Sequence, residues 1–331
     1  MTTSGVYSFT TTLTDHVRHA MLNIGKLGEA EVPTAQEFSD VTWKMNAMIK
    51  QWQGKADFAP GLKMWTRRIG ALMLGASINN YVLGPTVAPN SHWTLLQTLV
   101  YTTASVAAIT GASTITLAAV SQTNSGVTTT IANGFNIGIQ TNAADLFWTT
   151  VNGTPVGNVV TLSATLPAGV PVGAAVFCYQ SNAQNPIVVD AWVLRDTAGA
   201  DVPGRFMTVQ DYAMQPSKGQ SQFISDPYLA YFEYQLAGSN WFHEIYGSSN
   251  VGKYDVLWFR EPIQTFVNTT DNPEFPDEWV RAIQWGTSKE IAPMFNVPWD
   301  QQKEGLLQES LAFARQKDAE ITSMYFQPGN E

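Results

Sequence analysis

Near its start, the sequence has two stretches whose apolar residues recur at helical spacing. The first contains Leu13, Val17, Ala20, Met21 and Ile24, and the second contains Phe38, Val41, Met45, Met48, Ile49 and Trp52. Thr34 and Glu37 precede the second stretch as a capping box, in which a hydroxyl and a carboxylate bond each other's backbone amides. The pattern predicts two amphipathic helices, and the short connection predicts that they form an antiparallel pair.

The middle of the chain alternates apolar and polar residues, as strands do. Alternation occurs over residues 113–117, 135–140 and 158–162, and Asn-Gly pairs, which favour tight hairpin turns, occur at Asn133-Gly134 and Asn152-Gly153. Short strands at regular spacing predict an immunoglobulin-like β-sandwich of roughly 90 residues.

The last third begins with strand patterns and ends with helical ones. We expect a strand over 187–194 and a three-stranded meander over 228–236, 241–246 and 254–260. Pro276 suits the first turn of a helix through Trp279, Ile283 and Ile291, because that position needs no backbone N–H. A final helix is predicted from about Asp300, with Leu307, Leu311, Ala314 and Ile321 on one face.

These elements predict an α+β protein with a discontinuous helical domain made from both chain ends. Residues 1–84 and 270–331 would form its two halves. A β-rich region would occupy residues 186–269, and residues 85–185 would form an extra immunoglobulin-like β-sandwich module.

Charge is distributed very unevenly along the chain, which has a formal net charge of -9. Asp145 is the only charged residue from Ser91 to Val189, whereas the segment from Asp190 to Glu331 contains 10 basic and 20 acidic residues. The shift in composition supports a domain boundary. The acidic balance argues against a sequence-specific DNA reader but allows an acidic wall that repels passing DNA.

Targeting and redox features narrow the class further. No run of about 18 apolar residues is present, so we expect no membrane-spanning helix. The polar N-terminal residues do not resemble a signal peptide, and synthesis in a reducing cytoplasm is expected. Cys178, the single cysteine, lies in an apolar run and is expected to be an inert buried thiol.

One segment imitates a phosphate-binding loop. Gly247-Ser248-Ser249-Asn250-Val251-Gly252-Lys253 matches the first seven positions of a P-loop, but Tyr254 stands where a serine or threonine should hold Mg²⁺. A P-loop also opens a helix, whereas the residues from Tyr254 onward have a strand pattern. We therefore expect a hairpin turn and no nucleotide hydrolysis.

Other residues that could carry chemistry have simpler interpretations. His16 and His19 could share a helix face with Asp15, but a solvated helix face is the expectation. His243 alternates with Trp241 and Ile245, so a packed or exposed strand position is expected. Asp277 and Glu278 suit the first turn of a helix, where acids are favourable, although they could also serve as catalytic carboxylates. We expect that the protein is not an enzyme and that it has no cofactor and no metal site.

Several segments together resemble the head-to-tail adaptor proteins of short-tailed bacteriophages, also called connector or packaged-DNA-stabilisation proteins. The matching segments are residues 48–53 (MIKQWQ), 81–85 (YVLGP), 191–196 (AWVLRD), 199–203 (GADVP), 257–263 (LWFREPI), 275–279 (FPDEW) and 290–293 (EIAP). Their order and spacing carry the resemblance. Residues 91–184 depart from it and are interpreted as an added module.

The resemblance implies a structural virion protein located in the neck or tail and assembled in the host cytoplasm. Such adaptors form rings, usually of twelve copies, between the portal protein and the tail or nozzle protein. Double-stranded DNA passes through them without sequence-specific contact. Our candidate portal-docking residues lie where apolar residues meet a polar chain end. They are Tyr325, Phe326, Gln327 and Pro328.

Two other functions remain open. Aromatic residues over 228–234, with Trp241, Phe242, Trp258 and Phe259, could form a sugar-binding platform. The alternative is therefore a virion-associated peptidoglycan-degrading or glycan-binding protein. A third reading, a bacterial adhesin-like surface module, rests only on the threonine-rich middle segment.

Overall fold

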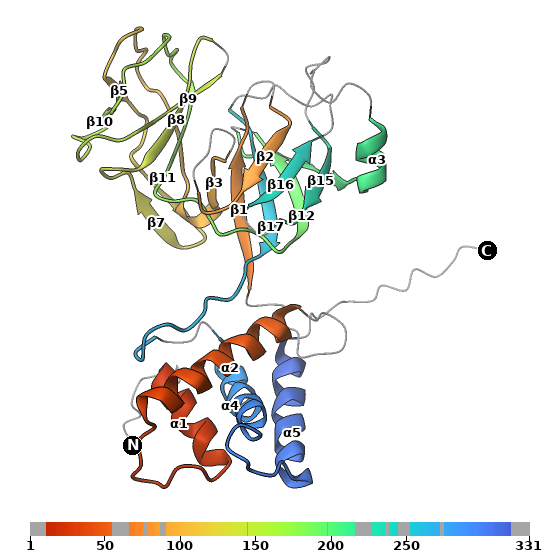
Figure 1. Cartoon of the computed structure of the whole chain (residues 1–331). Helices are drawn as coiled ribbons and strands as arrows, with labels where there is room; N and C mark the ends of the chain where they lie inside the picture. The colour runs from red at the N-terminus through yellow and green to blue at the C-terminus, as the bar shows by residue number, and fades with distance from the viewer. Residues whose placement is uncertain are drawn as a thin grey trace, which may run out of the picture. The chain divides into compact units, whose positions relative to one another are not determined.

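The computed structural model is a mixed α+β fold, as predicted. It describes residues 11–54, 66–75, 78–86, 91–143, 145–196, 198–215, 227–235, 238–243, 252–271 and 275–318. The chain divides into two compact units (Figure 1). The helical unit combines Met1–Thr66 with Pro262–Glu331, and the β unit is Arg67–Glu261.

The helical unit contains the helices expected from periodicity. They are α1 (Leu13–Asn23), α2 (Ala35–Gly54), α4 (Asp277–Ile291) and α5 (Gln301–Asp318). The capping box before α2 is confirmed, since Glu37 N donates to Thr34 Oγ1 at 3.3 Å and Thr34 N donates to Glu37 Oε2 at 3.0 Å. A second box, between Thr12 and Asp15, begins α1 and was not predicted.

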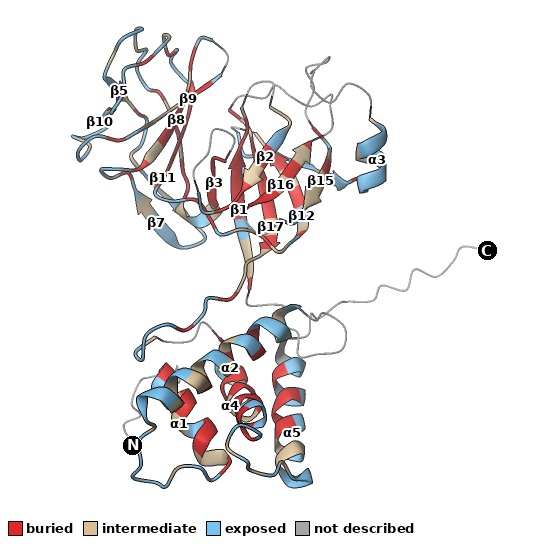
Figure 2. Cartoon of the chain, viewed as in Figure 1, coloured by how far each residue is buried: buried red, intermediate tan, exposed pale blue. Residues whose placement is uncertain are grey.

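One apolar core joins residues from both ends of the sequence. Met21 and Met45 belong to the same buried cluster as Trp279, Ile283 and Leu311. We expected α1 and α2 to pair with each other, but each packs more extensively on α4. The reason is that α4 buries residues around much of its circumference, including the small residues Ala282 and Gly286, which allow close approach. Figure 2 shows the buried residues facing inward on these helices.

An extended segment, residues 262–271, is fastened to α1 and α2 mainly by side chains. Asn46 holds the backbone of Phe266 twice, donating to its carbonyl and accepting from its amide at 3.0 Å each. Gln53 accepts from Ile263 N at 3.0 Å, and Leu13 N donates to Asp271 O at 2.9 Å. We expected the β-rich region to extend to residue 269. Residues 262–269 instead belong to the helical unit, so the β unit ends earlier, at Glu261.

Two sheets form the centre of the β unit. The five-stranded sheet has the order β13-β12-β17-β1-β3, and the four-stranded sheet has the order β14-β15-β16-β2. The strands are β1 (Arg67–Met73), β2 (Asn80–Leu83), β3 (Trp93–Leu95), β12 (Val188–Arg195), β13 (Asp201–Pro203), β14 (Arg205–Phe206), β15 (Leu229–Glu233), β16 (Ser239–His243) and β17 (Tyr254–Arg260), and α3 (Val209–Met214) follows β14. Leu72, Trp93, Trp241 and Leu257 belong to one core shared by both sheets.

Two expectations fail here. Residues 1–84 are not all helical, because β1 and β2 are strands of the β unit. The expected three-stranded meander is also wrong: β15 pairs with β16, whereas β17 pairs with β1 and β12 in the other sheet. The first residues of β17, Tyr254–Leu257, are all buried, which suits a central strand covered on both faces.

The threonine-rich middle segment folds as a closed antiparallel barrel. Its strands are β4 (Val100–Thr103), β5 (Thr114–Thr116), β8 (Asn136–Gln140), β9 (Leu146–Thr150), β10 (Val159–Thr161) and β11 (Ala175–Tyr179), with a hairpin of β6 (Ser121–Asn124) and β7 (Val127–Thr130) and a short helix η1 (Leu96–Thr98). Bridges at Ala104–Leu117 and Val151–Leu162 join the β4-β11-β8-β9 sheet to the β10-β5 pair at both edges. A closed circuit therefore replaces the separate sheets of the sandwich that we expected.

The barrel shares a core with the rest of the β unit. Alternate residues of β11 face opposite ways: Val176 and Cys178 lie in the barrel's own core, whereas Phe177 and Tyr179 pack with Val256 of β17. The predicted inserted module is thus joined to its neighbour by a continuous apolar contact. Cys178 is fully buried, as expected, and burial raises the pKa of its thiol.

Candidate functional site

The predicted docking and phosphate-loop residues lie largely beyond the part of the chain that the structure describes. Tyr325, Phe326, Gln327 and Pro328 are outside it, as are residues 247–251 of the P-loop-like segment. Tyr254, which follows that segment, begins a strand, and this confirms the pattern that argued against a P-loop.

The structure separates the two histidines of α1. His19 is exposed, but His16 is only 1 % exposed and its Nε2 lies 3.0 Å from Thr11 Oγ1. Burial lowers the pKa of His16 to about 4. The expected solvated position is therefore wrong for His16, which packs near the rings of Phe266 and Phe275.

Within the described residues, no helix combines the length and apolar character needed to cross a bilayer. Over the same ranges, no three of the His, Cys, Asp and Glu side chains come together as metal ligands would.

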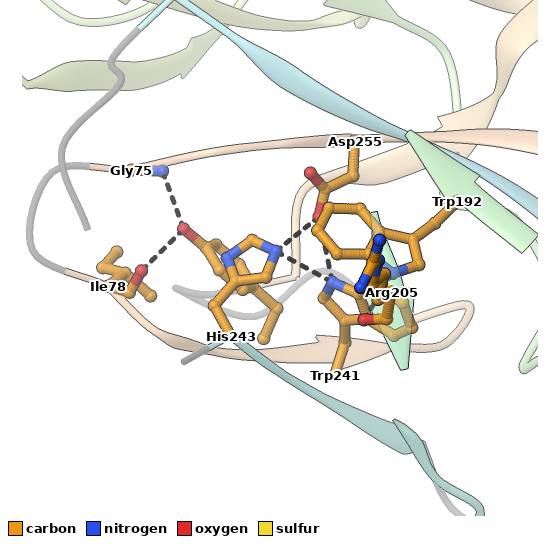
Figure 3. Close-up of polar contacts among 8 residues, drawn as sticks. Gly75, Ile78, Trp192, Arg205, Trp241, His243 and Asp255 are labelled. Atoms are coloured by element: carbon orange, nitrogen blue, oxygen red, sulfur yellow. Dashed lines mark hydrogen bonds and ion pairs between the residues drawn. The ribbon is translucent and has the colours of Figure 1, made fainter. Parts of the chain in front are cut away.

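A buried polar network lies between the two sheets of the β unit (Figure 3). Asp255 of β17 is fully buried, and its Oδ2 lies 2.6 Å from His243 Nε2 and accepts from Trp241 Nε1 at 2.9 Å. His243 and Trp241 come from β16, in the four-stranded sheet that faces β17. One carboxylate oxygen thus joins the two sheets. His243 occupies a packed strand position, one of the two that we expected.

Aromatic rings enclose this network. The ring of Trp192 stacks at 5.7 Å from that of His243, and Tyr81 meets His243 edge-on at 5.6 Å. Tyr81 OH donates to Ile78 O at 2.9 Å, and burial together with the charge of Asp255 raises the pKa of that phenol. The enclosure favours a structural role, in which the network fixes how the sheets face each other.

Asp277 and Glu278 line a groove between α4 and α5. They occupy the first turn of α4, as predicted. The α4–α5 groove, about 320 Å³ in volume, is lined by Asp277, Glu278, Arg281, Glu309, Ser310 and Phe313. The described lining residues include three carboxylates and one guanidinium, which give this part of the groove a negative charge. Phe313, which is 55 % exposed, gives it an apolar wall.

A second cavity, the seam pocket, lies where the barrel meets β12 and β17. It has a volume of about 300 Å³ and is lined by Leu96, Leu99, Tyr101, Gln122, Asn124, Arg195, Asp196, Ala198, Gly199 and Tyr254. Its amides are held in place: Gln122 Oε1 accepts from Tyr101 N at 2.5 Å, and Asn124 Nδ2 donates to Leu99 O at 2.7 Å. The sequence pattern did not predict that these residues would line one pocket.

The predicted aromatic platform is divided between a core and a surface. Trp241 and Phe259 are buried, whereas Tyr231 and Phe242 lie on the outer side of their sheet with rings 5.8 Å apart. Tyr212 of α3 covers Phe242 at 4.8 Å. The outer rings therefore pack largely on one another.

Comparison with known proteins leaves the family open. No protein-family model matches the chain, and no curated protein gives a significant match.

Proposed function

We propose that this protein is a structural subunit of a bacteriophage virion, a head-to-tail adaptor. In this proposal it forms a ring of twelve copies between the portal and the tail or nozzle protein, assembles in the host cytoplasm and surrounds the DNA channel. It has no catalytic role.

The observation that carries the proposal is the exposure of large aromatic side chains on the helical unit. Trp43 of α2 is 67 % exposed and Phe313 of α5 is 55 % exposed. Tryptophan and phenylalanine are enriched at the centres of protein–protein interfaces, where burial gives them a large favourable free energy. Two such residues on different helices suit a subunit that contacts neighbours through more than one face.

The composition of the helical core adds support. Core residues from α1 and α2 pack with residues from α4 and α5, so the chain returns to its starting unit after the β unit. The adaptor resemblance implies that a helical domain and a C-terminal segment dock on the portal. The barrel, an insertion relative to that resemblance, would decorate the ring or contact the capsid.

The excess of acidic residues in the last part of the chain is compatible with a channel for DNA. The segment from Asp190 onward has twice as many acidic as basic residues. Duplex DNA carries one negative charge per roughly 1.7 Å of axis, so carboxylates facing the lumen would keep it from adhering during ejection. In the same proposal Tyr325, Phe326, Gln327 and Pro328 dock into the portal.

Negative-stain imaging of the purified protein, alone and mixed with portal rings, tests the proposal. We expect rings of defined symmetry, in isolation or stacked on the portal. Dispersed monomers in both samples would overturn it. Deleting Tyr325–Glu331 should leave the protein folded and lower its affinity for the portal, because the apolar anchor is lost.

Glycan binding is a second candidate function, favoured by the seam pocket. Fixed amides beside the Tyr101 and Tyr254 rings, which are 6.0 Å apart, resemble the mixture of polar and aromatic groups that binds neutral sugars. Calorimetric titration with peptidoglycan fragments tests this function. Saturable binding that disappears in Gln122→Ala would support it, and loss of peptidoglycan turbidity would indicate hydrolysis.

A further inference from the structure

We propose that neighbouring copies join by inserting the Trp43 corner of one copy into the α4–α5 groove of the next. The Trp43 corner is Trp43 with its neighbour Lys44. This inference rests on the proposed ring and names the surfaces that build it. Each copy would contribute one corner and one groove, both from the helical unit.

The geometry of α2 points the Trp43 corner away from its own core. Val41, Met45 and Met48 of α2 are buried, whereas Trp43, on another side of the helix, is 67 % exposed. Lys44 Nζ lies 5.6 Å from the centre of the indole ring, so a cation accompanies the exposed aromatic surface.

The groove is complementary to the Trp43 corner in size, aromatic character and charge. Its volume, about 320 Å³, is large enough for an indole ring, and Phe313 supplies an aromatic wall. Among the described lining residues, Glu309 and the first-turn acids of α4 outnumber the cation Arg281, so this part of the groove attracts a lysine. On the corner's side, Asp40 is the nearby acid, and it accepts from Gln36 Nε2 at 3.0 Å.

The two surfaces differ, and that difference determines the assembly. An interface made from two unlike patches is head-to-tail, and it closes into a ring when the rotation between copies allows. A self-complementary patch would instead stop at a dimer. The structure therefore assigns a second copy of this chain as the occupant of the groove.

Complementary variants test this contact. Trp43→Ala removes the corner and keeps the groove, whereas Phe313→Ala with Glu309→Lys damages the groove and keeps the corner. In sedimentation velocity, each variant alone should associate at least about 30-fold more weakly than the natural sequence, the typical loss for an interface anchor. Mixed in equal amounts, they should form a dimer and nothing larger, because the two remaining surfaces are both damaged.

Two controls separate this contact from general effects. Met214→Ala on α3, also a large exposed apolar residue at 77 %, should leave association unchanged. Lys44→Glu should weaken association more than Lys44→Gln, because it brings a carboxylate to an acidic groove. Circular dichroism should show all variants folded.

Three results would overturn the contact. They are a Trp43→Ala protein that associates normally, a mixture that shows no dimer, and a natural protein that stays monomeric at every concentration. In each case the proposed adaptor function would survive if rings still appear on the portal, so the two proposals fail separately.

Discussion

Arg67 and Arg260 lie directly opposite each other in the antiparallel pair of β1 and β17, and they share one carboxylate. Asp190 of β12 receives Arg260 Nη2 at 2.8 Å and Arg260 Nε at 3.1 Å, and Arg67 Nε lies 3.3 Å from its Oδ2. Like charges directly opposite in a sheet are unfavourable. Asp190 therefore makes this cross-strand pairing possible.

We predict that Asp190→Ala lowers the free energy of unfolding of the β unit by about 1–3 kcal/mol, the range for hydrogen bonds to charged groups. Urea denaturation measures the loss. Asp201→Ala is the matched control, because Asp201 also pairs with an arginine but its side chain is 38 % exposed against 20 % for Asp190. Asp201→Ala should lower the free energy of unfolding by no more than about 1 kcal/mol. Equal losses would contradict the shared role of Asp190.

Two helix glycines should respond in opposite directions to alanine. A Cβ at Gly286 of α4 would lie 2.5 Å from the ring of Trp52 and 2.7 Å from Met48 Sδ. Gly286→Ala should therefore destabilise the helical unit by about 1–3 kcal/mol, since a rigid indole must move. At Gly305 of α5 no atom lies within 4 Å of a new Cβ, so Gly305→Ala should stabilise it by about 0.5–1 kcal/mol. Thermal melts of both variants measure these changes. A stabilised Gly286→Ala or a destabilised Gly305→Ala would contradict the prediction.

Local periodicity predicted much of the secondary structure. The apolar stripes of the four long helices and the alternation in β5, β8 and β10 are confirmed, because each segment's pattern reflects the face that it buries. Ile321, the last residue of the predicted stripe in α5, lies outside the described residues. The pairing of β17 with β1 and β12 was missed. Strand partners far apart in sequence leave no local signal, and Arg67-Arg68 at the start of β1 does not have the pattern of a buried strand.

The candidate sites were harder to predict for the same reason. Asp255 was the detectable signal, a charged residue within an apolar strand, yet its partners His243 and Trp241 become visible only when two sheets face each other. His16 was expected on a solvated face because its covering rings, Phe266 and Phe275, come from the far end of the chain.

Acid should destabilise each unit through a buried histidine whose pKa lies below its ordinary value. Burial lowers the pKa of His16, in the helical unit, and of His92, in the β unit, to about 4, from an ordinary value of 6.5. Between those pH values the unfolded chain binds a proton that the folded chain does not, so stability falls as pH falls. The loss approaches about 3 kcal/mol for each histidine by pH 4, at 1.36 kcal/mol per pKa unit.

Urea titrations at pH 7 and pH 4.5 measure this loss. His92→Phe is the informative variant, because His92 stacks on Trp148 at 3.6 Å and a phenyl ring preserves a flat partner. It should lower stability at pH 7, where the bond between His92 Nδ1 and Tyr179 OH at 2.9 Å is lost, and reduce the pH dependence of the β unit alone. An unchanged pH slope would mean that other groups cause the acid sensitivity.

The barrel provides the last prediction, because its two cores lead to different behaviour once it is removed from the chain. Its interior includes Ile137, Val160 and Val176 and is supplied by the barrel alone. A fragment of residues 98–182 should therefore melt cooperatively with a β-type circular dichroism spectrum. Its outer face, including Phe177 and Tyr179, would lose the cover of β1 and β17. We expect that fragment to self-associate and to bind a hydrophobic dye.

Replacing both Phe177 and Tyr179 with threonine should remove the dye binding and the self-association without unfolding the fragment, because both side chains point away from the barrel's interior. A random-coil spectrum of the unmodified fragment would show that the interior core is insufficient. A monomeric fragment without dye binding would show that the covered face needs no partner. Either result would contradict the division of β11 into an inward and an outward set of side chains.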